Sequence, residues 1–154
     1  MRFYSLSDLK ILIYALNYKP ENVGTGKYTG ELVDFLLERK VEIRIITTNP
    51  YYPSWVCQKN RYKYENYEKL KIYRCPLWIP KNPKAFSRVL HLITFALSSL
   101  PIFIKLLFWK PNGIITIAPT IFCAQIVCFA KIFFRKRIKT WLHIQDFEID
   151  AAFD

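Results

Sequence analysis

The chain has 154 residues, of which 23 are Lys or Arg and 12 are Asp or Glu, so its formal net charge is +11. This length suits one domain or a piece of a larger chain. An apolar content of 52% with four glycines excludes a disordered or collagen-like chain, which lacks the apolar surface to offset the entropy of ordering. The basic excess leaves nucleic acid, an anionic membrane surface or a phosphorylated substrate as classes of partner.

Strand and helix patterns alternate along the chain, which predicts an α/β fold with a parallel sheet and helices on both faces. Residues 11–16, ILIYAL, are an uninterrupted apolar run, typical of a central strand covered on both sides. In chain order, the predicted elements are a strand at 11–16, a loop at 17–27, a helix at 28–39, a strand at 41–47, a loop at 48–55, a charged connection at 60–70, a strand at 71–75, a helix at 87–109 interrupted or kinked at Pro101, a strand at 113–118, a helix at 120–134 and a strand at 139–145.

Two apolar stretches, at 89–108 and 114–134, have about the length that crosses a bilayer. Pro101 and Lys105 interrupt the first, and Pro119 and Lys131 interrupt the second. We therefore favour a buried core helix and a strand-helix pair. The alternative is a small integral membrane protein that spans the bilayer through both stretches.

Three glycines follow the first predicted strand, at Gly24, Gly26 and Gly30. Backbone amides at the start of a helix can face an anionic group, and Lys27 adds a charge suited to phosphate. The spacing differs from that of the dinucleotide-binding fingerprint, and no Walker lysine-serine pair follows. A flexible strand-helix loop is the alternative interpretation.

His143 lies near the carboxyl end of the last predicted strand, where doubly wound folds place their ligands. Asp146, Glu148 and Asp150 follow it. These residues lack the glycine and the later glutamate of a calcium loop and the partners of a zinc site, so we predict no metal. The alternative is a core histidine followed by an acidic turn.

Aromatic and basic residues are interleaved between residues 51 and 74, a pattern that suits stacking on single-stranded nucleic acid. No recognised nucleic-acid motif accompanies it, so we predict no nucleic-acid partner. A second basic set borders the two apolar stretches. Its members Arg88, Lys105 and Lys110, with Trp109 as an interfacial anchor, predict a surface that faces an anionic membrane. The alternative is an ordinary basic surface over a buried core.

Taken in order, these segments resemble the N-terminal half of GT-B glycosyltransferases of the retaining family 4 type, close to the colanic-acid and exopolysaccharide group. The matching stretches are 11–32, 47–55, 73–80, 90–101 and 141–153. The resemblance implies a Rossmann-like acceptor-side domain at 11–154, preceded by an extension at 1–10 that it does not explain.

The resemblance also implies an activity, the transfer of a sugar from a nucleotide-sugar to a lipid-diphosphate-linked saccharide of bacterial surface polysaccharide. Gly24 and Gly26, with Lys27, would contact the donor diphosphate, and His143 would be the catalytic residue near the transferred sugar. Asp146 and Glu148 would bind substrate hydroxyls. No cofactor is implied, and the expected location is cytoplasmic, peripheral at the inner face of the cytoplasmic membrane.

Three features depart from the family pattern. Lys40 stands where a glycine commonly ends the first helix, residues 1–10 precede the usual start, and the sequence stops at Asp154, before a donor-binding domain. We therefore expect a chain that is incomplete for catalysis by itself. The alternative is a non-catalytic remnant, or a partner subunit that needs a separate donor domain. Four scattered cysteines, interpreted as buried small hydrophobes, suit a reducing compartment.

Overall fold

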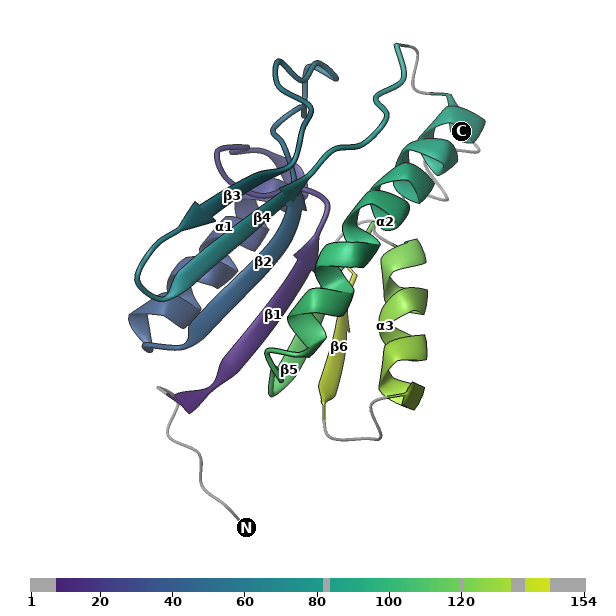
Figure 1. Ribbon diagram of the computed structural model, residues 1–154. Coiled ribbons are helices and arrows are strands. Elements are labelled where there is room, and N and C mark those ends of the chain that lie inside the picture. Colours follow the sequence, from purple (N-terminus) through teal and green to yellow (C-terminus); the bar gives the residue numbers. More distant parts are fainter. Residues whose placement is uncertain (1–7, 82–83, 120, 134–137, 145–154) are drawn as a thin grey trace.

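The computed structural model describes residues 8–81, 84–119, 121–133 and 138–144, which form an α/β domain around one six-stranded sheet (Figure 1). The strand order is β3-β4-β2-β1-β5-β6, and every pairing is parallel except that of β3 with β4. The elements are β1 (Lys10–Ala15), α1 (Gly24–Glu38), β2 (Glu42–Thr48), β3 (Lys63–Asn66), β4 (Leu70–Cys75), α2 (Ala85–Leu107), β5 (Gly113–Ile117), α3 (Ile121–Phe133) and β6 (Lys139–His143).

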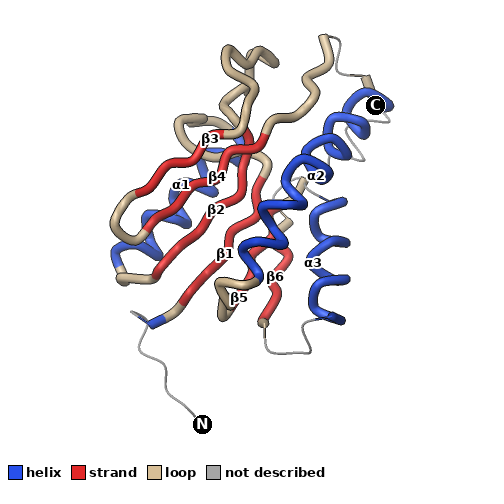
Figure 2. The backbone as a smooth tube through the Cα atoms, viewed as in Figure 1, coloured by secondary structure: helices blue, strands red, loops and turns tan. Residues whose placement is uncertain are grey.

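Helices cover both faces of the sheet, with α1 on one side and α2 and α3 on the other (Figure 2). Alternate residues of β1 enter the two cores, because successive strand side chains point to opposite faces. Leu12 and Tyr14 pack beneath α2 and α3, whereas Ile13 packs with Val33 of α1. All four are fully buried, which confirms the prediction of a central strand covered on both faces.

One strand, β3, was not predicted from the sequence. The predicted connection at 60–70 contains β3, which pairs antiparallel with β4 at the edge of the sheet. Its four residues are mostly exposed and polar, so they lack the apolar pattern of a strand. Pairing with β4 stabilises this strand in the absence of an apolar pattern. Tyr64 lies opposite Tyr73, and the centroids of the two rings are 5.0 Å apart.

Helix α1 begins at Gly24, four residues before the predicted start, so residues 24–27 form its first turn and not a loop. Gly24 has φ +54°, a left-handed conformation that costs glycine little. At the other end Lys40 adopts φ +62°, and its N–H donates to the carbonyl of Leu37 at 2.8 Å. Lysine thus makes the left-handed turn that glycine usually makes after a helix.

Helix α2 is continuous through Pro101, so of the two predicted outcomes there, an interruption or a kink, the interruption is wrong. The carbonyl that loses its helical partner is that of Leu97, an exposed residue, so it can reach water. Within the described residues, the segment Phe86–Leu107 is the one helix long and apolar enough to cross a membrane. Its Phe95 and Phe103 are nevertheless buried in the domain core, and the stretch 114–134 divides into β5 and α3.

The cysteines differ from one another in burial. Cys75 and Cys123 are buried, and burial raises the pKa of each thiol to about 12. Cys57 is half-buried and Cys128 is exposed on α3, so the interpretation of all four as core residues is wrong for Cys128. All four are free thiols.

Candidate functional site

A small cavity of about 70 Å³ lies at the carboxyl ends of β1 and β5, and we call it the switch-point cavity. The chain leaves β1 toward β2 on one side and returns to β5 on the other, so the loops that follow these strands separate there. Parallel α/β sheets bind ligands at such points. The cavity is lined by Asn17, Gly24, Thr25, Tyr51, Tyr52, Trp55 and Pro119.

Glu21 holds the walls of this cavity together, and the sequence analysis missed it. The side chain is 5% exposed. Its Oε1 accepts hydrogen bonds from the backbone N–H groups of Tyr51 and Tyr52, both at 2.8 Å, and its Oε2 accepts one from Asn17 Nδ2 at 2.8 Å. One carboxylate therefore joins the loop after β1 to the loop after β2, which pre-organises the cavity.

The glycines of the first turn have two different roles. Gly24 lines the cavity, and the first N–H groups of a helix have no partner within it, so the amides there are available to a ligand. At Gly26, an added Cβ would lie 2.9 Å from both Cβ and the backbone O of Glu21. Gly26 is thus required for the close approach of the Glu21 loop, a packing role that the glycine spacing alone does not reveal.

The other predicted site residues lie around this edge of the sheet without lining the cavity. Lys27 is exposed on α1, with its Nζ 3.9 Å from Glu31 Oε1. His143 is exposed at the end of β6, and its carbonyl accepts a hydrogen bond of 2.9 Å from the N–H of Ala118, beside the cavity wall. Asp146 and Glu148 lie outside the described residues.

Behind the cavity, a buried histidine orients one of its aromatic walls. His91 Nδ1 is 2.5 Å from the carbonyl of Trp78, so Nδ1 carries the proton and Nε2 accepts from the hydroxyl of Tyr51 at 2.9 Å. The imidazole also packs against Trp55 with ring centroids 5.3 Å apart. Burial lowers the pKa of His91, against the smaller opposing effect of the Trp78 carbonyl.

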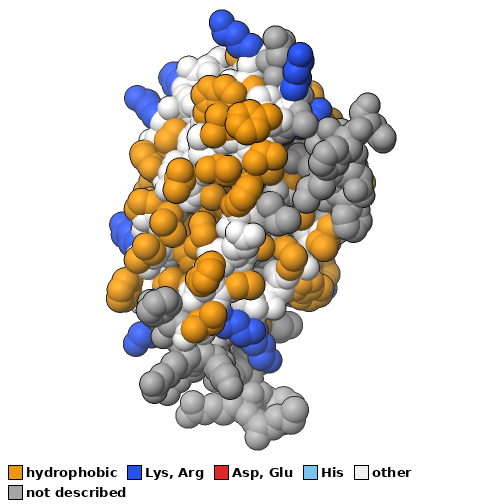
Figure 3. Space-filling model, turned by 90° about the vertical axis from the view of Figure 1, so that its right-hand side faces the viewer, with side chains coloured by type: hydrophobic (Ala, Val, Ile, Leu, Met, Phe, Trp, Pro, Cys, Tyr) orange, Lys and Arg blue, Asp and Glu red, His pale blue; other side chains and the backbone are white. Residues whose placement is uncertain are grey.

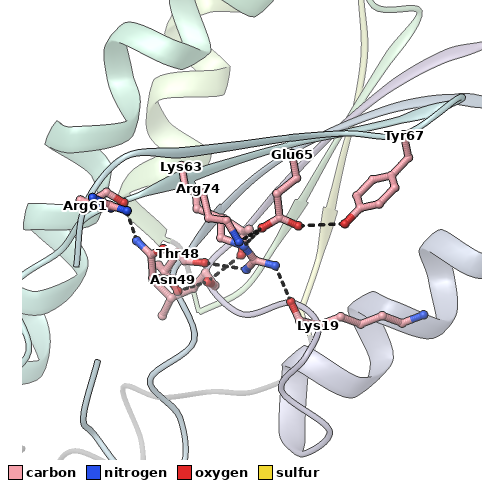
Figure 4. Close-up of polar contacts among 10 residues, drawn as sticks. Lys19, Thr48, Asn49, Arg61, Lys63, Glu65, Tyr67 and Arg74 are labelled. Atoms are coloured by element: carbon pink, nitrogen blue, oxygen red, sulfur yellow. Dashed lines mark hydrogen bonds and ion pairs between the residues drawn. The ribbon is translucent and has the colours of Figure 1, made fainter. Parts of the chain in front are cut away.

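A second and larger cavity, of about 680 Å³, lies at the carboxyl ends of β2 and β4, and we call it the basic cavity. Arg74, 6% exposed, is one of its lining residues, and Figure 4 shows the polar contacts that hold it. Its Nε donates to Glu65 Oε1 at 2.6 Å, and its two other nitrogens donate to the carbonyls of Thr48 at 3.0 Å and Lys19 at 2.8 Å. Burial acts to raise the pKa of Glu65, but hydrogen bonds from Arg74 and Lys63 outweigh it and lower that pKa.

The outer surface of α2 and α3 is apolar, and we call it the α2–α3 face (Figure 3). A groove of about 440 Å³ runs between the helices, and neither helix sequence contains Asp or Glu. Lys105 and Lys110 are exposed at the carboxyl end of α2, and Arg88 is half-buried near its start. Trp109 is half-buried. The Arg44 guanidinium lies over its indole, 4.2 Å from the centroid of the Trp109 ring. The exposed apolar side chains of the face include Leu97, Ile104, Phe108, Phe129 and Ile132.

The sheet order and the helices on both faces define a Rossmann-like α/β domain, and the switch-point cavity is the candidate ligand site at its carboxyl edge. In the described parts of the chain, no group of three or more His, Cys, Asp or Glu side chains could hold a metal ion.

No family model matches the chain. In an alignment of 148 positions that covers 93% of this chain, the sequence is 45% identical to a protein of Escherichia coli (strain K12) named as the colanic acid biosynthesis glycosyl transferase WcaI. The chain spans 35% of that protein's length. It is therefore related to glycosyltransferases of the colanic acid group, which confirms the resemblance predicted from its motifs.

Replacing Gly26 by Ala should destabilise the domain by about 1–3 kcal/mol, because the new methyl group would clash with the Glu21 backbone. Gly30→Ala is the matched control on the same helix, where the methyl would press on the Lys19 side chain and on no Glu21 backbone; that side chain is exposed and can shift, at the cost of its ion pair with Asp34. Alanine has a higher helix propensity than glycine, by up to about 1 kcal/mol, and this gain should offset the cost of displacing the Lys19 side chain. Urea unfolding of both variants tests this, and equal stability changes would contradict the packing role of Gly26.

His91 should make the domain less stable in mild acid. Its folded pKa lies below the ordinary value of 6.5, so between these two pKa values the unfolded chain binds more protons than the folded domain. The free energy of unfolding should therefore decrease as the pH falls through 6.5. His91→Gln should show a smaller decrease in urea titrations at pH 8, 6.5 and 5.5, whereas an unchanged slope would assign the acid sensitivity to other groups.

Proposed function

We propose that this chain is the acceptor-side domain of a glycosyltransferase that moves a sugar from a nucleotide-sugar to a lipid-linked saccharide in bacterial surface polysaccharide biosynthesis. The observation that carries the proposal is the switch-point cavity, with the start of α1 in its wall, in a chain 45% identical to part of a colanic acid glycosyltransferase. The fold supports it because the carboxyl edge of a parallel sheet is where such substrates bind.

The donor diphosphate would lie against the first turn of α1. Transfer leaves negative charge on the departing diphosphate, and the amides near Gly24 and Thr25 stabilise such charge without reorganising. Lys27, exposed on the same turn, would add a screened attraction. A cavity of about 70 Å³ accommodates a phosphate group but no complete nucleotide-sugar, so the rest of the donor would be held by other residues.

His143 would orient the reacting sugar from the neighbouring strand. It ends β6 opposite Ile117, the last residue of β5, so the imidazole belongs to the same edge as the cavity. Its exposure leaves the side chain accessible to a ligand. Asp146 and Glu148, next along the chain, would bind sugar hydroxyls.

The α2–α3 face would hold the protein against the anionic inner surface of the cytoplasmic membrane. Exposed apolar patches mark interaction sites, and the lysines at this face match anionic headgroups. Phe108, 72% exposed, would insert into the lipid boundary beside Trp109, while Lys105, Lys110 and Arg88 would contact headgroups. Such docking brings the enzyme to an acceptor whose lipid tail remains in the bilayer.

A chimera tests the transfer activity. In it, this chain replaces the matched 148 residues of the E. coli relative. With tritiated UDP- and GDP-sugars and a bacterial lipid extract, the chimera should place label in the lipid fraction. His143→Ala should lower kcat at least about tenfold, because an orienting contact to the reacting sugar is lost. Lys139→Ala, on the same exposed strand, is the control.

Two results would contradict this proposal. One is a chimera that folds, as circular dichroism and urea unfolding report, and transfers no sugar while the relative does. The other is equal activity of His143→Ala and Lys139→Ala, which would remove His143 from the reaction.

Vesicle binding tests the membrane surface. The chain should sediment with vesicles of phosphatidylglycerol and phosphatidylcholine but not with phosphatidylcholine alone. Lys105→Gln should weaken binding about fivefold, since one cation near an anionic surface contributes about 1 kcal/mol. Lys71→Gln on β4 is the charge-matched control and should bind as the parent chain does.

Extraction with alkaline carbonate separates docking from spanning. A docked domain is released, whereas a chain that spans the bilayer stays with the membrane pellet. Retention after carbonate, or equal binding of the two lysine variants, would contradict the peripheral surface proposed for the α2–α3 face.

A further inference from the structure

The basic cavity has no part in the donor contacts proposed above, yet it is much larger than the switch-point cavity. Four cations and one carboxylate line it, which gives it a positive excess. The charged lining residues are Lys59, Arg61, Lys63, Arg74 and Glu65.

The positive charges of the cavity are not equally engaged. Arg74 donates from three nitrogens to protein acceptors, and Lys63 Nζ lies 3.1 Å from Glu65 Oε1. Among the described residues, neither the Lys59 ammonium nor the Arg61 guanidinium has a hydrogen-bonding or ion-pair partner. Two exposed cations and a buried guanidinium thus line the same cavity, a set of charges suited to a doubly charged anion.

The loop that carries these cations is held in place. Asn49 Nδ2 donates to the carbonyl of Arg61 at 2.7 Å (Figure 4). Asn60 bonds both the N–H and the carbonyl of Leu77, at 3.0 and 2.5 Å. Tyr62 donates its hydroxyl proton to the carbonyl of Ser98 on α2 at 2.8 Å. A ligand that binds Lys59 and Arg61 therefore loses little affinity to the entropic cost of ordering this loop.

The two cavities share a wall, the segment at 49–57. Tyr51, Tyr52 and Trp55 face the switch-point cavity, whereas Asn49 and Val56 face the basic cavity. Glu21 holds this segment through the N–H groups of Tyr51 and Tyr52. An anion in the basic cavity would thus lie across one loop from the proposed donor phosphate, where a second substrate can approach without displacing the first.

We propose that the basic cavity binds the diphosphate of the acceptor, with Lys59 and Arg61 as the residues that contact it. The identity of the acceptor rests on the proposed function; the preference for a diphosphate rests on the charge and volume of the cavity. A nucleic acid fits less well, because no recognised nucleic-acid motif accompanies the exposed tyrosines near this cavity.

Calorimetry on the chain with inorganic pyrophosphate tests this site without any donor or transfer step. The double variant Lys59→Gln/Arg61→Gln should bind pyrophosphate about tenfold more weakly, because it loses two attractions between solvent-exposed charges. Lys71→Gln, on the strand that carries Arg74 but at its opposite end, should bind as the parent chain does. The double variant should keep the parent's urea midpoint, since neither side chain bonds another described residue.

Two further ligands distinguish the sources of a diphosphate. Farnesyl diphosphate, a soluble isoprenoid diphosphate, should compete with pyrophosphate and lose affinity in the double variant. UDP should keep its affinity in the double variant. An equal loss for UDP would assign the basic cavity to the donor and overturn the proposal, as would unchanged pyrophosphate binding or an equal loss in Lys71→Gln. A chimera without transfer activity would leave these binding results unaffected, so failure of the proposed function is distinguishable.

Discussion

The burial of β1 on both faces is the constraint on which the rest of the structure depends. A strand without an exposed face must have neighbours in the sheet on both sides and helices above and below. The chain meets this requirement by sending α1 to one face and α2 to the other, on its way to β2 and then to β5. The loops after β1 and β5 therefore diverge, and the switch-point cavity lies where they part.

A cavity made by diverging loops needs a contact that holds its walls, and Glu21 supplies it. A buried carboxylate without partners would cost several kcal/mol, so its three hydrogen bonds are a condition of its burial. The same contact requires glycine at position 26, since a side chain there would push the Glu21 loop away. Loop geometry, helix start and cavity shape thus depend on one side chain.

Sequence patterns predicted the strands and helices that bury apolar surface, because burial imposes the periods of 2 and 3.6 that patterns reveal. They missed β3, whose polar residues are held by pairing with β4, and they placed the start of α1 too late. Glu21 escaped for a related reason. From sequence, a glutamate in a polar loop is expected to be exposed to solvent. Glu21 is buried because the distant loop at Tyr51 and Tyr52 packs over it and donates hydrogen bonds to its carboxylate.

The net charge of +11 does not by itself indicate a binding surface; the positions of the cations in the folded domain do. Along the chain the cations are scattered, but folding places one group around the basic cavity and another around the α2–α3 face. Both regions are poor in acidic residues, so each keeps a local positive potential that distant carboxylates cannot cancel beyond a Debye length of about 8 Å. Tyr62 bonds the carbonyl of Ser98 on α2, so the loop of the basic cavity packs directly against the helix of the apolar face. A molecule with an anionic head and an apolar tail would meet matching surfaces on neighbouring parts of one domain.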